Sequence, residues 1–471
     1  MAGNVPSEQA HPIGYTPVHH QSGEIMSDSH NQRYDCVVLG AGLAGLYAAY
    51  LLRQSNFSVG VLEARERVGG RVLTLRTLAH LQHAELGPEF IDSNHHRVIR
   101  LAERFNLTLS TRPDFWGVSP SSPFGRKAHR AWRRFWNEVY ALAAQVPDRH
   151  APWHAPESLR MLDCVTMRAF AERLGVWAAG EPLFRRYAQN MEATEPENLS
   201  VYSIAAQEAF YGKGVYAGVY RFVDGTDSLP RALAEVFTAL GGDLRLNAPV
   251  EAIEQTADGV RVYARQAGKP LTVQASYAIV ALPFPVLTQL EWRPALAPWR
   301  VEALQSAGKG AVIRTLIQFR RRFWRDEPFP RVYAERADIS AIWEETDLQA
   351  GESGVLSFWT GGDAARRWAS LSEGARIDEC RRVLEVMYPA CRAEVIAARS
   401  YDWQADPFAQ HAYIHHTTGY LTQALPLLRQ PEGRLHFAGD YLSLFVGYME
   451  GALEAGERAA HAVQDALRPP A

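Results

Sequence analysis

The chain has 471 residues, 47% hydrophobic and 21% charged, so it is long enough to bury a large core and to form two domains. Its formal net charge of −3, without a concentrated basic region, argues against a nucleic-acid partner. Four cysteines with no CxxC spacing predict neither a disulfide framework nor a metal site.

Residues 1–33 are rich in His, Ser, Pro and Gln and poor in aliphatic residues, so we expect a disordered N-terminal segment. They lack the charged-then-apolar pattern of a signal peptide. No run along the chain approaches the ~20 continuous apolar residues of a membrane-spanning helix. The sequence therefore predicts a cytoplasmic protein with no membrane partner.

A short strand and a glycine-rich turn follow this segment. Residues 36–39 (CVVL) are apolar, which is typical of a strand buried on both faces of a parallel sheet. The GxGxxG pattern after the strand consists of Gly40, Gly42 and Gly45. Such a turn lets the backbone approach a pyrophosphate, which binds the free N–H groups of a helix that we expect to end near Gln54.

A second strand ends in an acid. Residues 59–62 (VGVL) precede Glu63, at the spacing where a carboxylate binds the ribose hydroxyl groups of a dinucleotide. Glycine-rich turns also arise for steric reasons alone, but here the strand, helix, second strand and acid fall in register. The sequence therefore predicts a bound dinucleotide.

The next residues indicate which dinucleotide. Residues 63–71 (EARERVGGR) resemble the FAD-binding signature of the flavin-containing amine oxidase family, and within it the chain most resembles the monoamine oxidases. The resemblance implies FAD, with contacts from Ala64, Arg65, Gly70 and Arg71. Two glycines between arginines fit a backbone and guanidinium clamp on phosphate better than a solvated basic loop.

The resemblance also implies the architecture. We expect an α/β fold in which a Rossmann-like FAD-binding domain is interleaved with an α+β substrate domain, as in the amine oxidases and p-hydroxybenzoate hydroxylase. The FAD-binding domain would comprise residues 34–95, 219–293 and 399–467. The substrate-binding domain would comprise residues 96–218 and 294–398. The sequence leaves the oligomeric state open, with a homodimer as one option.

Residues 84–92 (AELGPEFID) read as a turn feeding a strand, and they resemble the family's E-L-G element beneath the flavin. The residues expected against the cofactor are Gly87, Pro88, Glu89 and Phe90. Phe90 is also expected to contact the substrate, and it stands where L-amino-acid oxidases place an arginine. Asp92 matches an active-site glutamate of polyamine oxidases; the alternative is that it caps a helix over residues 93–104.

The middle of the chain is less specific. Residues 98 to about 206 have a helical pattern, clearest over 126–144 and 166–174. Residues 210–216 (FYGKGVY) form an aromatic cluster in which Phe210 either lines an apolar substrate tunnel or belongs to the core. Residues 220–229 resemble a glycine turn that opens a helix near the flavin.

Several strands are expected in the second half. Residues 244–253 alternate like one strand, and Val250 matches the residue whose backbone meets the adenine. Residues 277–283 read as a buried strand with a proline stop. In the substrate domain, we expect strands over 312–319 and 354–360.

Arg314, on the first of the two substrate-domain strands, departs from the family pattern. The family normally has a lysine there, which holds a water against flavin N5 and is implicated in the reaction with oxygen. Arginine keeps the charge but cannot act as a proton donor that returns neutral near pH 7. O2 as the electron acceptor is therefore in doubt, and a dehydrogenase becomes an alternative.

The final segment is the most diagnostic. Residues 434–440 (RLHFAGD) read as a strand and a turn with Gly439 and Asp440. Residues 447–460 then open a long helix, whose N-terminus in the family points at the flavin pyrimidine ring and stabilises negative charge there. Met449 is expected against the flavin.

Two tyrosines stand face to face in front of the flavin of monoamine oxidases, and they match Tyr413 and Tyr448. Such a cage would orient an amine by its ring faces; the alternative is that both are ordinary core tyrosines. Trp403 is expected beside the ring system. Ala412 stands where those enzymes carry a cysteine bonded to the flavin, so FAD is expected to be non-covalent.

Amine oxidation needs a substrate C–H aimed at flavin N5 and an uncharged nitrogen. We predict an FAD-dependent amine oxidoreductase in which hydride transfer yields an imine that hydrolyses to an aldehyde or ketone, with O2 or another acceptor. The predicted catalytic residues are Tyr413, Tyr448 and Arg314. The predicted substrate contacts are Phe90, Asp92, Phe210, Tyr413 and Tyr448. A monoamine with an apolar or aryl body is the preferred substrate; the alternatives are an L-amino-acid or polyamine oxidase, or a flavin-dependent dehydrogenase or isomerase of an apolar substrate.

Overall fold

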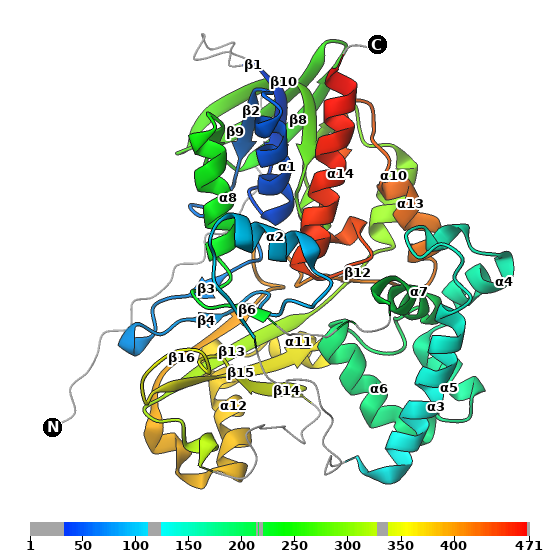
Figure 1. Ribbon diagram of the computed structural model, residues 1–471, viewed down its shortest axis with the longest axis vertical. Coiled ribbons are helices and arrows are strands. Elements are labelled where there is room, and N and C mark those ends of the chain that lie inside the picture. The colour runs from blue at the N-terminus through cyan, green and yellow to red at the C-terminus, as the bar shows by residue number, and fades with distance from the viewer. Residues whose placement is uncertain (1–32, 112–123, 213–214, 216–219, 327–337, 469–471) are drawn as a thin grey trace.

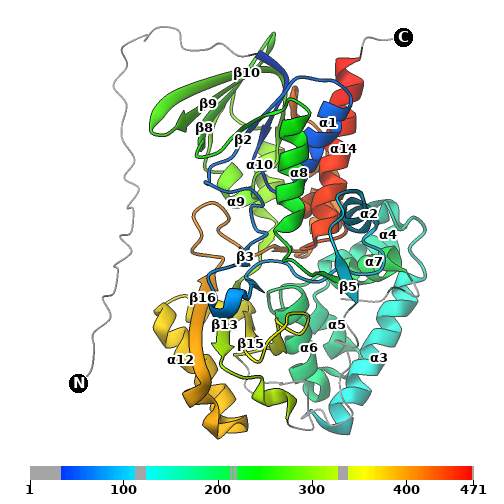
Figure 2. The same cartoon turned by 60° about the vertical axis from the view of Figure 1, so that its left-hand side comes forward.

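The computed structural model describes residues 33–111, 124–212, 215, 220–326 and 338–468. The predicted disordered segment lies outside these residues apart from Arg33, as do positions 213, 214 and 216 of the aromatic cluster. Figures 1 and 2 show a large sheet with its helices at one end of the molecule, and a smaller sheet beside a group of helices at the other. Among the described residues, no helix is both long enough and apolar enough to span a bilayer.

The large sheet has eight strands in the order β11-β8-β9-β10-β1-β2-β7, with β18 paired to the end of β10. Its strands are β1 (Arg33–Leu39), β2 (Val59–Leu62), β7 (Asp243–Arg245), β8 (Val250–Thr256), β9 (Gly259–Gln266), β10 (Lys269–Val280), β11 (Glu291–Arg293) and β18 (Leu435–Phe437). β1 runs parallel to β2 and β10, and β10 runs parallel to β18. The residues that follow β1, β2 and β18 therefore meet at one edge of the sheet, where dinucleotides bind in such folds.

β1 is buried on both faces, as predicted. Val37 and Leu39 belong to the hydrophobic cluster on one side of the sheet, whereas Cys36 and Val38 belong to the cluster on the other side. All four side chains are fully buried. This follows from the alternation of side chains along a strand, and it explains why the run is apolar throughout.

Three helices cover one face of the large sheet. They are α1 (Leu43–Gln54), α8 (Ser228–Ala239) and α14 (Met449–Leu467), and they lie side by side in Figures 1 and 2. α1 packs against both of the others. The approach of α14 to α1 depends on Gly456, because a Cβ at this position would lie 2.3 Å from the carbonyl oxygen of Ala44.

Replacing Gly456 with alanine is expected to lower the melting temperature, because α1 and α14 must separate to admit the methyl group. Overpacking destabilises a protein by about 1–3 kcal/mol. This loss is expected to outweigh the gain of about 1 kcal/mol from the higher helix propensity of alanine relative to glycine. Gly374→Ala is the matched control, since a Cβ at Gly374 of α12 (Glu373–Met387) meets nothing within 4 Å. Thermal melts of both variants check this, and a Gly456→Ala protein as stable as the wild type would contradict the proposed close packing.

The smaller sheet is antiparallel, in the order β14-β15-β13-β16. Its strands are β13 (Val312–Phe319), β14 (Ala341–Glu344), β15 (Gly354–Gly361) and β16 (Val395–Asp402). Three further pairs are β3 (Thr74–Leu75) with β4 (Ala84–Glu85), β5 (Leu109–Thr111) with β6 (Tyr220–Phe222), and β12 (Gly308–Lys309) with β17 (Ile414–His415). Further helices are α2 (His96–Arg104), α3 (Gly125–Ala143), α4 (Glu157–Arg160), α5 (Met167–Arg173), α6 (Trp177–Met191), α7 (Val201–Tyr211), α9 (Phe284–Leu287), α10 (Pro298–Gln305), α11 (Gly362–Trp368) and α13 (Leu425–Leu428).

Two predicted strands differ from the structure. Residues 244–253 form two strands, β7 and β8, rather than one. Asn247 between them has a φ of 52°, and Pro249 has no N–H to donate to a sheet. Residues 84–92 contribute only the two residues of β4 and a single bridge between Ile91 and Tyr220.

All three segments predicted for the FAD-binding domain supply strands to the large sheet: β1 and β2, then β7 to β11, then β18. The boundary at residue 399 falls inside β16, which pairs with β13 in the smaller sheet. The division into two domains with the predicted boundaries stays a prediction.

Candidate active site

The three glycines after β1 have different surroundings. Gly40 has a φ of 97°, and a Cβ there would lie 2.8 Å from the carbonyl oxygen of Ala281. A Cβ at Gly45 would lie 2.0 Å from the carbonyl oxygen of Gly40, so only glycine lets α1 start so close to the turn. A Cβ at Gly42 would meet nothing within 4 Å, and Gly42 is the N-cap of α1 without a side-chain cap. Gly42 therefore presents bare backbone and helix N–H groups, which fits a phosphate.

Glu63 is fixed at the ends of β1 and β2. Its carboxylate accepts the backbone N–H groups of Ala41 at 2.7 Å and Arg65 at 2.9 Å. Burial raises the pKa of Glu63, and these two hydrogen bonds partly oppose that shift. The N–H of Ala248 donates to the carbonyl oxygen of Glu63 at 2.8 Å, so Val250, the first residue of β8, follows at the same edge. This is where the adenosine half of a dinucleotide is expected.

The arginines after Glu63 bind protein groups, and the contacts predicted for Arg65 and Arg71 with a cofactor stay predictions. Their acceptors are Asp406 for Arg65, the carbonyl groups of Val68, Gly70 and Val72 for Arg67, and Asp440 with the carbonyl group of Ala412 for Arg71. Ala64 lies half-buried between Glu63 and Arg65. A Cβ at Gly70 would lie 3.4 Å from the Cα of Gly42, so two glycine backbones face each other at the start of α1. The backbone part of the predicted clamp fits a pyrophosphate, whereas the side chains hold the loop in place.

α14 begins at the same edge of the sheet. Tyr448 is its N-cap and makes no side-chain cap, and Met449 is its buried first residue. Gly439 and the buried Asp440 follow β18, and Asp440 pairs with Arg71. The free N–H groups of the first turn favour negative charge, as expected for a helix that faces an electron-accepting ring.

The E-L-G element packs onto the basic run. A Cβ at Gly87 would lie 2.2 Å from the carbonyl oxygen of Arg71, so these two backbones are in contact. Pro88 follows and is half-buried. Trp403 is buried and donates its indole N–H to the carbonyl oxygen of Leu86 at 2.8 Å. The E-L-G element and Trp403 thus lie against the basic run, whereas the next two predicted cofactor residues, Glu89 and Phe90, contact residues of the smaller sheet.

Tyr413 and Tyr448 come together from two separate segments. A Cβ at Gly447 would lie 2.9 Å from the ring of Tyr413, so this ring packs on the residue before Tyr448. The Tyr413 hydroxyl donates to the carbonyl oxygen of Asn190 at 3.4 Å. Burial raises the pKa of Tyr448 well above its ordinary value, and Tyr413 is among the groups that add to the shift. Two half-buried phenol rings therefore lie together at the N-terminus of α14.

His95 lies behind Tyr448. The two rings are 4.9 Å apart between centroids and 66° from parallel. The Nδ1 atom of His95 accepts the N–H of Asp92 at 3.1 Å, and burial lowers the pKa of His95 to about 3. Asp92 is itself buried and, after burial, adds most to the raised pKa of Tyr448. The structure thus places Asp92 beside one of the predicted cage residues.

A carboxylate from α14 caps the helix that follows Asp92, and the alternative role of Asp92 in capping the turn stays a prediction. α2 begins at His96, and its N-terminal N–H groups are satisfied by a carboxylate from α14. Glu450 accepts the N–H groups of Arg97 at 2.9 Å and Val98 at 3.0 Å. This contact also ties α2 to the start of α14.

The two predicted phenylalanine contacts lie on different sides of the tyrosine pair. Phe210 of α7 packs on Phe445, with ring centroids 4.7 Å apart, and its neighbour Tyr211 lies 6.2 Å from Tyr448. Phe90 packs on Trp343 at 5.8 Å, on the side of the smaller sheet. Phe210 therefore contacts Phe445, and it is the neighbouring Tyr211 whose ring lies near Tyr448.

Arg314 is buried and its charge is balanced. Its guanidinium donates to Glu89 Oε2 at 2.5 Å and to Glu345 Oε1 at 2.5 Å, with Nε donating to Ser357 Oγ at 3.0 Å. It also donates to the carbonyl oxygen of Gly87. Burial alone would lower the pKa of Arg314, but Glu345 and Glu89 more than offset this and raise it. The sequence predicted the positive charge at this position but not the two carboxylates that neutralise it.

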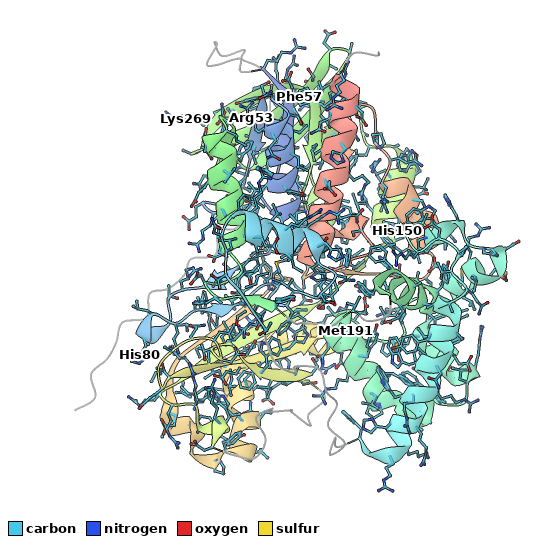
Figure 3. The ribbon with its side chains drawn as sticks, viewed as in Figure 1. Arg53, Phe57, His80, His150, Met191 and Lys269 are labelled. Atoms are coloured by element: carbon cyan, nitrogen blue, oxygen red, sulfur yellow. The ribbon has the colours of Figure 1, made fainter. Side chains whose placement is uncertain are left out.

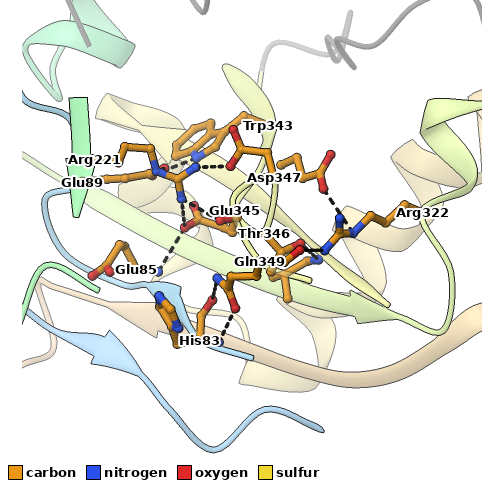
Figure 4. Close-up of polar contacts among 12 residues, drawn as sticks. His83, Glu85, Glu89, Arg221, Arg322, Trp343, Glu345, Thr346, Asp347 and Gln349 are labelled. Atoms are coloured by element: carbon orange, nitrogen blue, oxygen red, sulfur yellow. Dashed lines mark hydrogen bonds and ion pairs between the residues drawn. The ribbon is translucent and has the colours of Figure 1, made fainter. Parts of the chain in front are cut away.

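A second arginine completes this buried network (Figure 4). Arg221 pairs with the other oxygen of Glu89 at 2.8 Å, donates to the backbone carbonyl of Glu345 at 2.6 Å and pairs with Asp347. Trp343 donates to Glu89 Oε2 at 2.9 Å, and its ring lies 4.9 Å from the Arg314 guanidinium. Glu89, predicted to bind the cofactor, is thus held by two arginines and a tryptophan.

A small pocket opens beside this network. It is lined by His83, Ala84, Glu85, Glu89, Arg221, Phe222, Val223, Thr226, Glu345, Leu348 and Gln349. Burial raises the pKa of Glu85 to about 8, and the hydrogen bonds from Thr226 and Thr74 oppose that shift. Glu89 and Glu345, which bind Arg314, thus line a small polar pocket together with Arg221.

Two acids at the site escaped the sequence analysis. Glu345 lies 31 residues from Arg314 along the chain, in the connection between β14 and β15. Glu192 directly follows α6 and is 6% exposed; burial raises its pKa to about 7. Neither belongs to a motif, and both occur among other acids in the sequence, so only the fold brings them to the site.

The sheet edge where a dinucleotide is expected, the N-terminus of α14 and the pair Tyr413 and Tyr448 thus meet in one place, as in enzymes that oxidise small molecules with a flavin. The chain matches the model of the flavin containing amine oxidoreductases over residues 43–464, and it belongs to that family. It is therefore a flavin-dependent oxidoreductase of amines. The predicted family, fold class and enzyme class are confirmed.

Individual relatives agree with the family assignment. The chain is 27% identical over 460 residues to an amine oxidase [flavin-containing] of Oncorhynchus mykiss, covering 91% of this chain and 85% of that protein. It is 26% identical over 463 residues to amine oxidase [flavin-containing] B of Homo sapiens, covering 93% and 87%.

Two solved structures share the fold. Putrescine oxidase bound to putrescine has a TM-score of 0.80 at 23% identity, covering 92% of this chain and 99% of that one. Cyclohexylamine oxidase from Brevibacterium oxydans IH-35A has a TM-score of 0.79 at 22% identity, with the same coverage.

Proposed function

We propose that the enzyme binds FAD without a covalent bond and uses it to oxidise a small amine. A bound flavin would supply the hydride acceptor, N5, for the α-carbon of the uncharged amine, and O2 is the proposed final acceptor. The resulting imine is hydrolysed by water to an aldehyde or ketone. A cytoplasmic location and a homodimeric assembly stay predictions from the sequence.

The observation that carries this proposal is the meeting of Tyr413 and Tyr448 at the N-terminus of α14. Their ring faces would orient the amine and favour its approach, because an aromatic face attracts a positively polarised group. The helix N-terminus would stabilise negative charge on the reduced cofactor. A monoamine with an apolar body fits the aromatic layer of Phe210, Tyr211 and Phe445.

The remaining residues would hold the cofactor. The backbones of Gly42 and Gly70 would receive the pyrophosphate, and Glu63 the ribose. Ala412 at the position of the family's flavin-linked cysteine supports a non-covalent complex. Acid precipitation is expected to leave all yellow colour in the supernatant, and colour that stays with the pellet would contradict this.

A second candidate differs in the electron acceptor. The charge of Arg314 is balanced by Glu89 and Glu345, so it would present less positive charge to a reduced flavin than a free lysine. This favours a dehydrogenase, or an oxidase that reacts slowly with oxygen.

Anaerobic mixing with a panel of amines tests the proposed function. The flavin absorbance near its visible maximum is expected to bleach with one or more primary amines and not with alcohols of the same carbon skeleton. Admitting air afterwards separates the two candidates, because rapid recovery of colour indicates an oxidase and slow recovery a dehydrogenase. A yellow protein that no amine bleaches would contradict amine oxidation.

A further inference from the structure

One carboxylate near the tyrosine pair has no hydrogen-bond or ion-pair partner among the residues that the structure describes. Glu192 follows Met191, which Figure 3 shows near the centre of the molecule. Glu192 is 6% exposed, and no described residue gives its carboxylate a hydrogen bond or an ion pair. Three residues further on, the equally buried Glu195 pairs with Arg185 at 3.1 Å and accepts from Gln189 at 3.0 Å. Buried carboxylates normally have hydrogen-bond or ion-pair partners, as Glu195 does. A buried carboxylate without such a described partner, as at Glu192, is therefore unusual.

The charge of Glu192 acts on four buried tyrosines. Burial raises the pKa of each of these tyrosines, and Glu192 raises each one further; they are Tyr187 of α6, Tyr211 of α7, Tyr413 and Tyr448. For Tyr413, Glu192 is the one described charged group that adds to burial. The hydroxyl of Tyr413 also lies on the carbonyl group of Asn190, two residues before Glu192. Glu192 therefore belongs to the segment that accepts the Tyr413 hydroxyl, and the Tyr413 ring in turn packs on Gly447, the residue before Tyr448.

Other charges near these rings are negative as well. Glu208 of α7 and Asp92 both raise the pKa of Tyr448. Burial raises the pKa of Glu208, with no described cation to oppose it, and the same holds for Glu192. Excess negative charge beside two aromatic faces favours a bound cation.

A substrate amine reaches the enzyme as a cation, because alkylammonium groups have pKa values of about 10, as in lysine. Hydride loss needs the uncharged nitrogen, so one proton must leave first. We propose that Glu192 binds the ammonium group of the substrate and accepts this proton before hydride transfer. The N–H bond breaks and leaves its electron pair on nitrogen, and an O–H bond forms on the Glu192 carboxylate. The step is a proton transfer in which nothing is oxidised or reduced.

The burial of Glu192 suits this role. Its pKa of about 7 leaves it ionised at pH 8, where it attracts a cation, and close enough to neutrality to accept a proton. The inference rests on the proposed amine oxidation and adds to it the proton acceptor. The aromatic rings alone orient the amine but do not remove its proton.

Binding of an amine that cannot be oxidised tests the proposal on the FAD-loaded enzyme. The probe is α,α-dimethylbenzylamine, which has no hydrogen on its α-carbon, and its binding is followed by the change in the visible flavin spectrum from pH 6 to pH 9. Affinity of the wild type is expected to rise as the pH passes about 7, since Glu192 ionises while the amine stays protonated. Glu192→Gln is expected to lose this rise and to bind about 10- to 100-fold more weakly at pH 8.

Two further variants make the test specific. Glu192→Asp keeps a carboxylate and is expected to keep the rise in affinity. Glu208→Gln makes the same chemical change on the neighbouring helix, and its affinity is expected to fall about threefold or less. Equal losses in Glu208→Gln and Glu192→Gln would show that the summed negative charge binds the cation, and would overturn the assignment to Glu192.

Stability separates this role from a structural one. A carboxyl group whose pKa is raised in the folded state stabilises the fold below its unfolded pKa, and that contribution is lost as the pH rises through about 7. Glu192→Gln is therefore expected to melt at the same or a higher temperature than the wild type at pH 8. A lower melting temperature, or an unchanged pH dependence of binding, would overturn the proposal. If amines bleach the wild-type flavin but the Glu192 tests fail, the proposed amine oxidation stands and only the role of Glu192 is overturned. If no amine bleaches the flavin, both proposals are overturned.

Discussion

Replacing Arg314 with methionine is expected to lower the free energy of unfolding by about 3–5 kcal/mol, because two buried carboxylates then share Arg221 as their one remaining described cation. Glu89 and Glu345 are 3% and 1% exposed, and both bind the Arg314 guanidinium at 2.5 Å. Methionine fills a similar volume, so the loss would come from charge rather than from a cavity. Denaturant unfolding monitored by tryptophan fluorescence measures the change.

Two further variants define the cause of this loss. Arg314→Met combined with Glu345→Gln is expected to recover part of the stability, because one uncompensated charge is removed with the cation. Arg367→Met is the surface control: this side chain is 59% exposed and pairs with Asp338, and its loss is expected to cost no more than about 1 kcal/mol. An Arg314→Met protein that unfolds like the wild type would show that the network contributes little.

The tyrosine pair is expected to have the largest effect on the reaction. Changing Tyr413 and Tyr448 together to leucine should slow anaerobic flavin reduction by about 5- to 1,000-fold, since each ring face supplies about 0.5–2 kcal/mol to a positioned cation. Changing both to phenylalanine keeps the faces and removes only the hydroxyl groups. Stopped-flow absorbance measures the rate of bleaching for both double variants at equal FAD content.

The phenylalanine pair is expected to stay within about threefold of the wild type if the ring faces act as proposed. A phenylalanine pair as slow as the leucine pair would instead assign the effect to the hydroxyl groups. A leucine pair as fast as the wild type would exclude the cage.

The cofactor edge could be predicted from sequence because its determinants are local. Gly40, Gly42 and Gly45 lie within six residues, and their roles follow from the turn that they form. The same holds for β1, whose apolar run predicts burial on both faces. The strand predicted over residues 244–253 failed because alternation of apolar residues does not reveal the break at Asn247 and Pro249.

The charges of the site could not be predicted, because they depend on partners far along the chain. Arg314 meets Glu89 across 225 residues and Glu345 across 31. The sequence shows an arginine in place of a lysine, but only the fold shows that two carboxylates neutralise it. Glu192 is recognised in the same way: a buried acid is distinguished from a surface acid by what surrounds it.

The deuterium isotope effect on anaerobic flavin reduction tests the central claim most directly, using the amine that bleaches the enzyme fastest and the same amine with deuterium on its α-carbon. The account predicts that bleaching slows severalfold with the deuterated amine, because the α C–H bond breaks as hydride passes to flavin N5. Both amines must be saturating, which is shown by a bleaching rate that no longer rises with amine concentration. Equal rates at saturating concentrations would contradict C–H cleavage as the step that reduces the flavin.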